Sequence, residues 1–306
     1  MTGPASGKRG DAAAVLVVSS LVARGAVGGR AAVFVLERMG HPVWFLPTVL
    51  LPWHPGHGRA SRSLPAEADF EALAGDLARA PWLAEVGAVL TGYFATPAQV
   101  EAAAALVDAV KGANPAALHL CDPVLGDLRP DGSGGLYVPE PTALAIRDRL
   151  VPRADIVTPN RFEAGWLAGL PVSTTAETLA AARALGRRIA VVTSAPAMMA
   201  RSVAALMVTE ARAIQAEHPL VDGAPHGTGD LFAAAFLARV LGGAAPEAAL
   251  ERAAATVFDM VARSVRAGAD ELLLAPEQDV IAHSMASVSI RTVAEPRRPA
   301  PTGGAR

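Results

Sequence analysis

Short apolar runs that alternate with stretches of helical spacing constrain most strongly how this chain can fold. An unbroken apolar run is typical of a strand buried on both faces, and a helix between two such strands is the crossover of a parallel pair. The sequence therefore predicts an α/β protein with a mostly parallel central sheet. The strands that we expect are Ala14–Ser19, Val43–Thr48, Ala88–Thr91, Ala117–Cys121, Asp155–Thr158 and Ile189–Thr193. The helices that we expect between them are Gly29–Met39, Phe70–Arg79, Pro97–Lys111, Pro141–Leu150, Arg161–Ala168 and Thr175–Arg187.

The later part of the chain departs from this alternation. Val203–Thr209 and Arg212–Glu217 follow each other closely, which favours a meander of edge strands. After Asp230 the apolar spacing predicts two long helices and a shorter one. These helices should cover Leu231–Leu241, Pro246–Arg266 and a segment that begins at Pro276.

No linker rich in glycine, serine or proline divides the chain, so we expect a single domain over residues 13–290. Residues 1–12 and the proline-containing tail, residues 291–306, carry no apolar period and are expected to be disordered. The glycine-containing stretch Asp131–Gly135 is expected to be a loop that acts as a lid over a site.

Composition excludes several classes of protein. The net charge of -2 argues against a general nucleic-acid binder, which would show a basic face. Cys121 is the one cysteine, so there is no internal disulfide, as suits a reducing cytoplasm. No run of about 18 apolar residues predicts a membrane span. The start of the chain lacks the apolar segment of a signal peptide.

The segment His226-Gly227-Thr228-Gly229-Asp230 precedes an apolar helical run. A helix start offers unpaired backbone N–H groups to an anion, and glycine lets the backbone approach closely. A carboxylate beside such an anion site can accept the proton of an alcohol that attacks phosphorus. The segment therefore indicates the catalytic end of a small-molecule kinase, although a simple turn with an N-cap aspartate has the same appearance.

Polar residues follow the predicted strands where an open parallel sheet binds its ligands. Asp122, Asp127 and Glu163 could hold Mg²⁺ there, directly or through water. Glu163 could instead be a first-turn carboxylate favoured by the helix dipole, and Asp122 the cap of a turn. Thr193-Ser194 could hydrogen-bond nucleotide phosphates or only cap a strand.

Other site types fit the sequence less well. The glycines of Gly25–Arg30 lack the GxGxxG register, and no GxxxxGK[ST] loop is present. Arg30 could contact a phosphate, but a solvated arginine at a helix start is the simpler interpretation. His54 and His57 could suggest a metal pair, but the sequence offers no third ligand.

Together these segments resemble the pyridoxal kinase family of the ribokinase-like kinases, over about Ala14 to Arg266. The order and spacing of the CDPVLGD, TPNxxE and GTGD motifs carry most of this resemblance. The LYVP and TGY segments point to the pyridoxal kinase branch. The matching segments are Val22–Phe34, Thr91–Tyr93, Cys121–Asp127, Leu136–Pro139, Thr158–Glu163 and Gly227–Asp230.

The resemblance implies a ribokinase-like three-layer sandwich and ATP-dependent phosphorylation of pyridoxal at the 5′-hydroxyl, with pyridoxine and pyridoxamine as further candidate acceptors. It implies that Asp230 is the base and that the Gly227, Thr228 and Gly229 backbone stabilises the transferred phosphoryl group. It also implies a cytoplasmic homodimer. Ser20, Tyr93, His54 and Asp230 would bind the vitamin. Asp122, Tyr137, Asn160, Glu163, Thr193, Ser194 and Thr228 would bind ATP. Asp122 and Glu163 would hold Mg²⁺, and Asp127 and Thr158 a monovalent cation, K⁺ or Na⁺.

The chain departs from the family pattern mainly in the vitamin pocket. Leu21 replaces a histidine, Gly29 an asparagine and Pro55 a threonine, while Ala234 replaces a glycine in the last motif. The phosphoryl-transfer residues are intact, so two alternatives stay open. One is a kinase for another small alcohol, such as hydroxymethylpyrimidine or a sugar. The other is a metabolite-binding protein without catalysis, against which the intact Asp230 argues.

Overall fold

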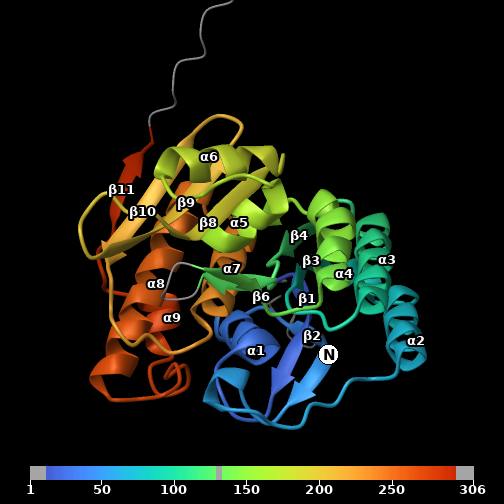
Figure 1. Ribbon diagram of the computed structural model, residues 1–306. Coiled ribbons are helices and arrows are strands. Elements are labelled where there is room, and N and C mark those ends of the chain that lie inside the picture. Colours follow the sequence, from blue (N-terminus) through green and yellow to red (C-terminus); the bar gives the residue numbers. More distant parts are fainter. Residues whose placement is uncertain (1–11, 129–132, 294–306) are drawn as a thin grey trace, which may run out of the picture.

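The structure is a computed structural model, and it describes residues 12–128 and 133–293. The described residues form one sheet of nine strands, in the order β11-β10-β9-β8-β7-β4-β3-β1-β2 (Figure 1). Its strands are β1 (Ala14–Val22), β2 (Val43–Leu51), β3 (Val86–Thr91), β4 (Leu118–Cys121), β7 (Ile156–Val157), β8 (Ile189–Ala195), β9 (Ser202–Thr209), β10 (Ala213–Pro219) and β11 (Ser289–Thr292). Two further strands, β5 (Gly126–Leu128) and β6 (Gly134–Leu136), form a separate antiparallel pair.

The strand directions match the sequence prediction. Strands β2, β1, β3, β4, β7 and β8 pair in parallel. Strand β9 runs antiparallel to β8, and β10 antiparallel to β9, which confirms the predicted meander.

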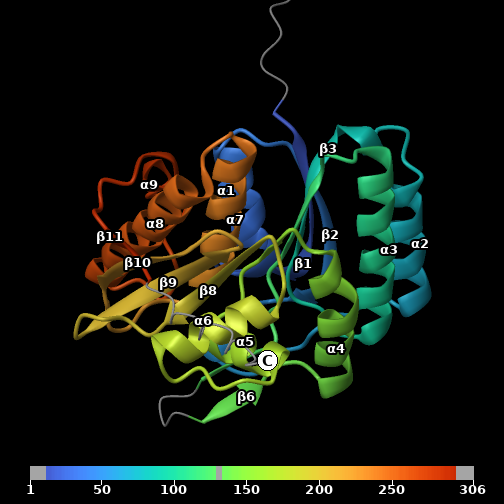
Figure 2. The same ribbon diagram turned by 90° about the horizontal axis from the view of Figure 1, so that it is seen from above.

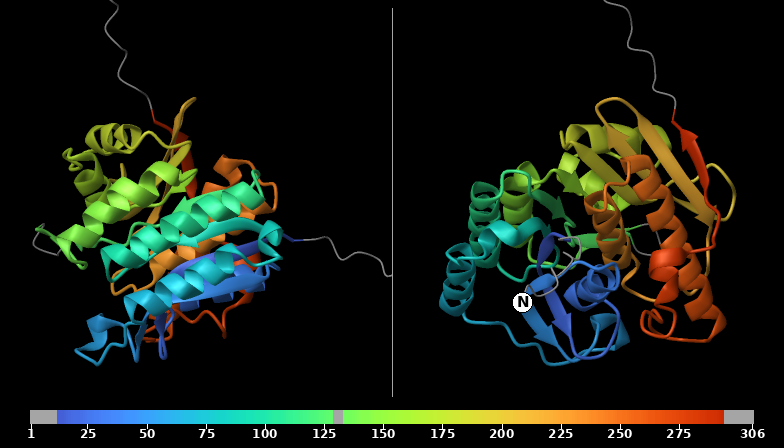
Figure 3. Two further views of the ribbon diagram at one scale, coloured as in Figure 1. Left: turned by 90° about the vertical axis from the view of Figure 1, so that its right-hand side faces the viewer. Right: turned by 180° about the vertical axis from the view of Figure 1, so that it is seen from behind.

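Helices cover both faces of the sheet and make three layers (Figure 2). One layer contains α1 (Gly28–Arg38), α7 (Thr228–Leu241), α8 (Pro246–Arg266) and α9 (Asp279–His283). The other contains α2 (Glu67–Ala78), α3 (Pro97–Ala113), α4 (Glu140–Ala145), α5 (Arg161–Ala168) and α6 (Thr175–Ala184). The left view of Figure 3 shows α2 and α3 side by side along this second face. The predicted α/β sandwich is confirmed.

Strand β1 shows why the central strands are apolar throughout. Side chains alternate between the two faces of a strand. Val15 and Val17 pack with the α1–α7–α8 layer, and Leu16 and Val18 pack with the α2–α3 layer. All four side chains are fully buried, and each contributes roughly 1.5–3 kcal/mol of hydrophobic stabilisation.

The structure corrects two predictions about the elements and adds one pair of strands. Arg291 and Thr292, assigned above to a disordered tail, lie in β11 and pair with β10. The helix expected over Pro141–Leu150 is the short α4 followed by a π-helical turn, Ile146–Leu150. The β5–β6 pair was not predicted.

Parts of several predictions lie outside the described residues. These are residues 1–11, residues 294–306, and residues 131 and 132 of the expected lid. Gly134 and Gly135, also assigned to that lid, belong to β6. Within the described ranges, no helix is long and apolar enough to cross a membrane.

Candidate active site

The site lies where the parallel strands end and helix α7 begins. Gly227 is the N-cap of α7, and its φ of 97° is a backbone conformation that glycine adopts readily. A Cβ added to Gly227 would overlap the carbonyl oxygen of Ala26, so the two backbones are in close contact. The start of α7 is therefore packed directly against the loop before α1, and its free N–H groups can face an anion.

Asp230 lies in the first turn of α7 and is partly accessible. Burial raises the pKa of its carboxyl to about 6, although N–H groups of Gly28 and of Asp230 itself donate to it and act in the opposite direction. A carboxyl with this pKa is largely ionised at neutral pH and still basic enough to accept a proton. The position expected for the base thus has suitable chemistry.

Asp122 follows β4 and is buried. The hydroxyl of Thr158 donates to its Oδ1 over 3.0 Å. Burial, and next the negative charge of Asp230, raise the pKa of Asp122 to about 8. Two like charges in a buried place favour a cation between them, so this carboxyl fits a magnesium ligand.

Glu163 has a structural role that accounts for both of its oxygens. It accepts hydrogen bonds from the N–H groups of Leu125 (2.8 Å) and Gly126 (3.4 Å) on one oxygen and of Asn160 (2.8 Å) on the other. Asn160 accepts in return from the Glu163 N–H, which completes the capping box of α5. The helix-start interpretation of Glu163 therefore describes its contacts, and a direct bond to a metal would have to replace one of them.

No cluster of three or more histidine, cysteine, aspartate or glutamate side chains with metal-binding geometry occurs in residues 12–128 and 133–293. Asp127 is exposed and accepts from the N–H of Leu128 (2.7 Å), whereas Thr158 is buried and bonds to Asp122. Among the described contacts no hydrogen bond joins Asp127 to Thr158. Tyr137 is 62% exposed next to Asp127, and partial burial followed by the charge of Asp127 raises its pKa to about 12.

A cavity of about 200 Å³ opens beside the start of α7. Thr193, Ser194 and Thr228, all expected to bind ATP, are among the residues that line it. Ser194 has a φ of 53°, a strained value for a residue with a side chain. The apolar walls include Val221, Phe232, Val257, Phe258 and Val261. Such apolar walls suit the flat heteroaromatic base of a nucleotide.

Two residues expected to bind the vitamin lie on neighbouring strand ends. Ser20 is buried, and its hydroxyl lies against Gly28, where any Cβ would collide with it. The backbone of Tyr93 is fixed by two hydroxyls: Ser19 accepts from its N–H (3.2 Å), and Thr48 donates to its carbonyl (2.7 Å). Sequence reasoning missed these roles of Ser19 and Thr48, although each is the last residue of a predicted strand.

His54, also expected to bind the vitamin, is the N-cap of the turn Pro55–His57. Its Nδ1 accepts from the N–H of Gly56 (3.0 Å), and its ring packs on that of His226, with 4.1 Å between centroids. Burial, then the rings of His226 and His57, lower the pKa of His54 to about 4. The third imidazole near His54 and His57 is that of His226, the residue before the GTGD segment. The three rings lack metal-binding geometry in the described structure.

The structure shows what surrounds the residues that depart from the family pattern. A Cβ on Gly29 would collide with the ring of Phe45, so the phenyl group occupies the space of a side chain at this position. Pro55 starts the 3-10 turn η1 (Pro55–His57). Arg30 is exposed and donates to the carbonyls of Val22 and Ala23, which agrees with the helix-start interpretation.

Comparisons with known proteins agree with this fold. A family model described as phosphomethylpyrimidine kinase matches residues 74–274. A protein of Corynebacterium diphtheriae named pyridoxal kinase PdxY is 33% identical over 92% of this chain and 99% of its own length. A pyridoxine/pyridoxal/pyridoxamine kinase of Bordetella bronchiseptica is 38% identical over 85% of this chain and 93% of its own. The structure of pyridoxal kinase from Leishmania donovani in complex with ADP and pyridoxamine matches with a TM-score of 0.84, at 28% identity, over 92% of this chain and 99% of that one.

Proposed function

The chain belongs to the pyridoxal kinase family, and we propose that it transfers the γ-phosphoryl group of ATP to the 5′-hydroxyl of pyridoxal. The observation that carries this proposal is the carboxyl of Asp230, with its pKa raised to about 6, at the N-terminus of α7. Solved relatives hold ADP together with pyridoxamine or with pyridoxine, which supports a B6 vitamer as the acceptor.

The geometry suits an in-line transfer. Asp230 takes the proton of the acceptor hydroxyl while the hydroxyl oxygen bonds to the γ-phosphorus of ATP. The bond from that phosphorus to the oxygen that bridges to the β-phosphate breaks, which releases ADP. The N–H groups at the start of α7 stabilise the charge on the phosphoryl oxygens. The close contact between Gly227 and Ala26 holds this helix start in place.

Within this proposal Asp122 would hold Mg²⁺ directly, while Glu163 would act through water because its oxygens already accept backbone hydrogen bonds. When bound, Mg²⁺ neutralises phosphate charge during the transfer. Tyr137, Asn160, Thr193, Ser194 and Thr228 would contact ATP. Asp127 and Thr158 would line a site for K⁺ or Na⁺, a role that the family resemblance alone supports.

Ser20, Tyr93 and His54 would surround the vitamin. A cytoplasmic homodimer also belongs to the proposal, and its support is likewise the family resemblance. Sedimentation at micromolar concentration tests the dimer.

The test of the activity is a panel of acceptors with ATP and Mg²⁺. Pyridoxal, pyridoxine or pyridoxamine should be phosphorylated. Asp230→Asn should reduce kcat by roughly 10²–10⁴-fold, the usual contribution of a general base, while ligand binding is largely kept. An unchanged rate in this variant would place the base elsewhere.

A second candidate is a kinase for hydroxymethylpyrimidine. The description of the matching family model favours it, and so do Gly29 and Pro55 in the vitamin pocket. Turnover of hydroxymethylpyrimidine without turnover of any B6 vitamer would select this candidate. Ligand binding without any turnover would select the non-catalytic binding protein.

A further inference from the structure

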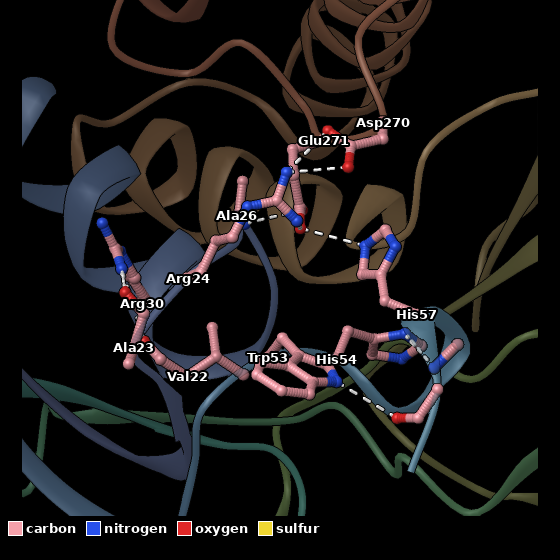
Figure 4. A network of polar contacts seen from close by, with 12 residues as sticks. Val22, Ala23, Arg24, Ala26, Arg30, Trp53, His54, His57, Asp270 and Glu271 are labelled. Carbon is pink, nitrogen blue, oxygen red and sulfur yellow. Dashed lines mark hydrogen bonds and ion pairs between the residues drawn. The ribbon is translucent and has the colours of Figure 1, made fainter. Parts of the chain in front are cut away.

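Glu271 lies in the loop after α8 and joins three segments that are far apart in sequence (Figure 4). Its side chain is 14% exposed. Its Oε2 accepts from the N–H of Ala26 over 3.2 Å, and its Oε1 lies 3.0 Å from Nε2 of His57 and 3.5 Å from Nη1 of Arg24. One carboxylate thus holds the loop before α1 and the turn η1 together.

The first of these contacts reaches the proposed anion site in one step. The carboxylate lies against Gly25, where a Cβ would come within 2.9 Å of Oε1 and where φ is +118°. The next residue, Ala26, gives its N–H to Glu271 and places its carbonyl against Gly227, the N-cap of α7. A shift of this loop would therefore displace the start of the helix that carries Asp230.

The second contact reaches the same place from the other side. His57 ends η1, and the turn is closed by the Trp53 Nε1–H, which donates to the Gly58 carbonyl over 3.1 Å. Within this turn Gly56 lies against the ring of His226, where a Cβ would collide with it. His226 directly precedes Gly227. Both segments that Glu271 holds therefore touch the residues at the start of α7.

The neighbouring ion pair differs in burial. Arg24 contacts Asp270 through two hydrogen bonds of 2.8 and 2.7 Å, but the two side chains are 56% and 60% exposed. Exposed pairs of this kind contribute little, whereas a largely buried carboxylate with three partners is more costly to disturb. Glu271 therefore contributes more to this network than the Arg24–Asp270 pair does.

We propose that Glu271 is a positioning residue of the kinase: it holds the loop before α1 and the turn η1 against the start of α7, and so sets the acceptor hydroxyl opposite Asp230. This inference rests on the proposed function. It assigns a role to a residue that no motif of the site contains. Of the residues that line the nucleotide cavity, only Thr228 and Gly229 belong to this helix start, so ATP binding should change less than vitamin binding.

The test compares Glu271→Gln and Glu271→Ala with a matched control, Glu277→Gln. Glu277 lies in the same part of the chain and is ion-paired with Arg263 at 2.8 Å, but it touches neither loop. Glu271→Ala should raise KM for pyridoxal roughly tenfold to a hundredfold, the effect of small misplacements in an active site, and raise KM for ATP by a clearly smaller factor. Glu271→Gln should have a smaller effect because its amide oxygen can still accept from Ala26. An unchanged KM for pyridoxal, or an equal rise in both KM values, would overturn the proposal.

A double-mutant cycle tests the transmission through His57. The variant with both His57→Ala and Glu271→Ala should raise KM for pyridoxal no further than Glu271→Ala alone, because Glu271→Ala already removes the contact with His57. If the factors by which the two single substitutions raise KM multiply in the double variant, the two residues do not act through their mutual contact.

Amide hydrogen exchange of the ligand-free protein separates this inference from the proposed function. In Glu271→Ala, amide exchange should be faster in residues 23–27, 54–58 and 226–230. In Glu277→Gln, exchange in these residues should equal that of the wild-type protein. Unaltered exchange in all three segments would refute the role of Glu271. If Glu271→Ala exchanges faster than the wild-type protein in these segments, but the wild-type protein does not phosphorylate pyridoxal, the proposed function alone is refuted.

Discussion

Replacing Gly227 by alanine should damage both stability and catalysis. At a φ of 97° an alanine costs roughly 1–3 kcal/mol of backbone strain. Its Cβ would also overlap the Ala26 carbonyl and lie 3.1 Å from Cγ1 of Val27, and overpacking of this kind typically costs about 1–3 kcal/mol. The two costs together are about 2–6 kcal/mol, which for a chain of this size should lower Tm by roughly 3–10 °C.

The assay is thermal unfolding without ligands, with Gly229→Ala as the matched control from the same motif. A Cβ on Gly229 would have no atom within 4 Å, so this variant should keep or slightly raise Tm, since alanine is the better helix former. If Gly227→Ala melts at the temperature of the wild-type protein, or if both variants lose the same stability, the argument from close packing is wrong.

Two further predictions concern the acceptor side of the site. Because Asp230 must be ionised to accept a proton and burial raises its pKa to about 6, kcat/KM for the acceptor should rise about tenfold per pH unit below pH 6 and level off above it. The same raised pKa stabilises the protonated folded form, so this contribution to stability should be lost as pH rises through 6; a pH-independent kcat/KM would contradict the assignment. Gly29→Asn should lower Tm through its clash with Phe45, and adding Phe45→Ala should recover part of the loss, whereas strictly additive losses would show that the two positions do not compete for space.

Local signals in the sequence were sufficient for much of the fold. The predicted bounds of Arg161–Ala168 coincide with those of α5 because Asn160 and Glu163 form a capping box, which is a local signal. Strands buried on both faces were equally clear, since each is an unbroken apolar run.

Elements that depend on distant partners could not be predicted. Strand β11 looks like the start of a charged tail, and its place in the sheet depends on distant partners: it pairs with β10, and Arg291 forms an ion pair with the buried Glu217 at 2.7 Å. The strands β5 and β6 are three residues long, too short for any periodicity to be visible.

The site divides in the same way. Asp122 and Asp230 could be predicted from motifs, and their electrostatic coupling places them near each other. Glu271 belongs to no motif, because its partners Ala26 and His57 are distant in sequence and chosen by packing alone. Glu163 illustrates a third case, in which one residue fits both a structural and a metal-related interpretation.

Cys121 gives this protein an internal reporter. Its thiol is free and buried immediately before Asp122, and burial raises its pKa to about 12. Only roughly one thiol in 10⁵ is then ionised at neutral pH, so alkylating reagents should modify the folded chain extremely slowly. The rate of modification at this one sulfur therefore measures how often the end of β4 opens, and its slowing by added nucleotide or vitamer would give their affinities without a coupled enzyme assay.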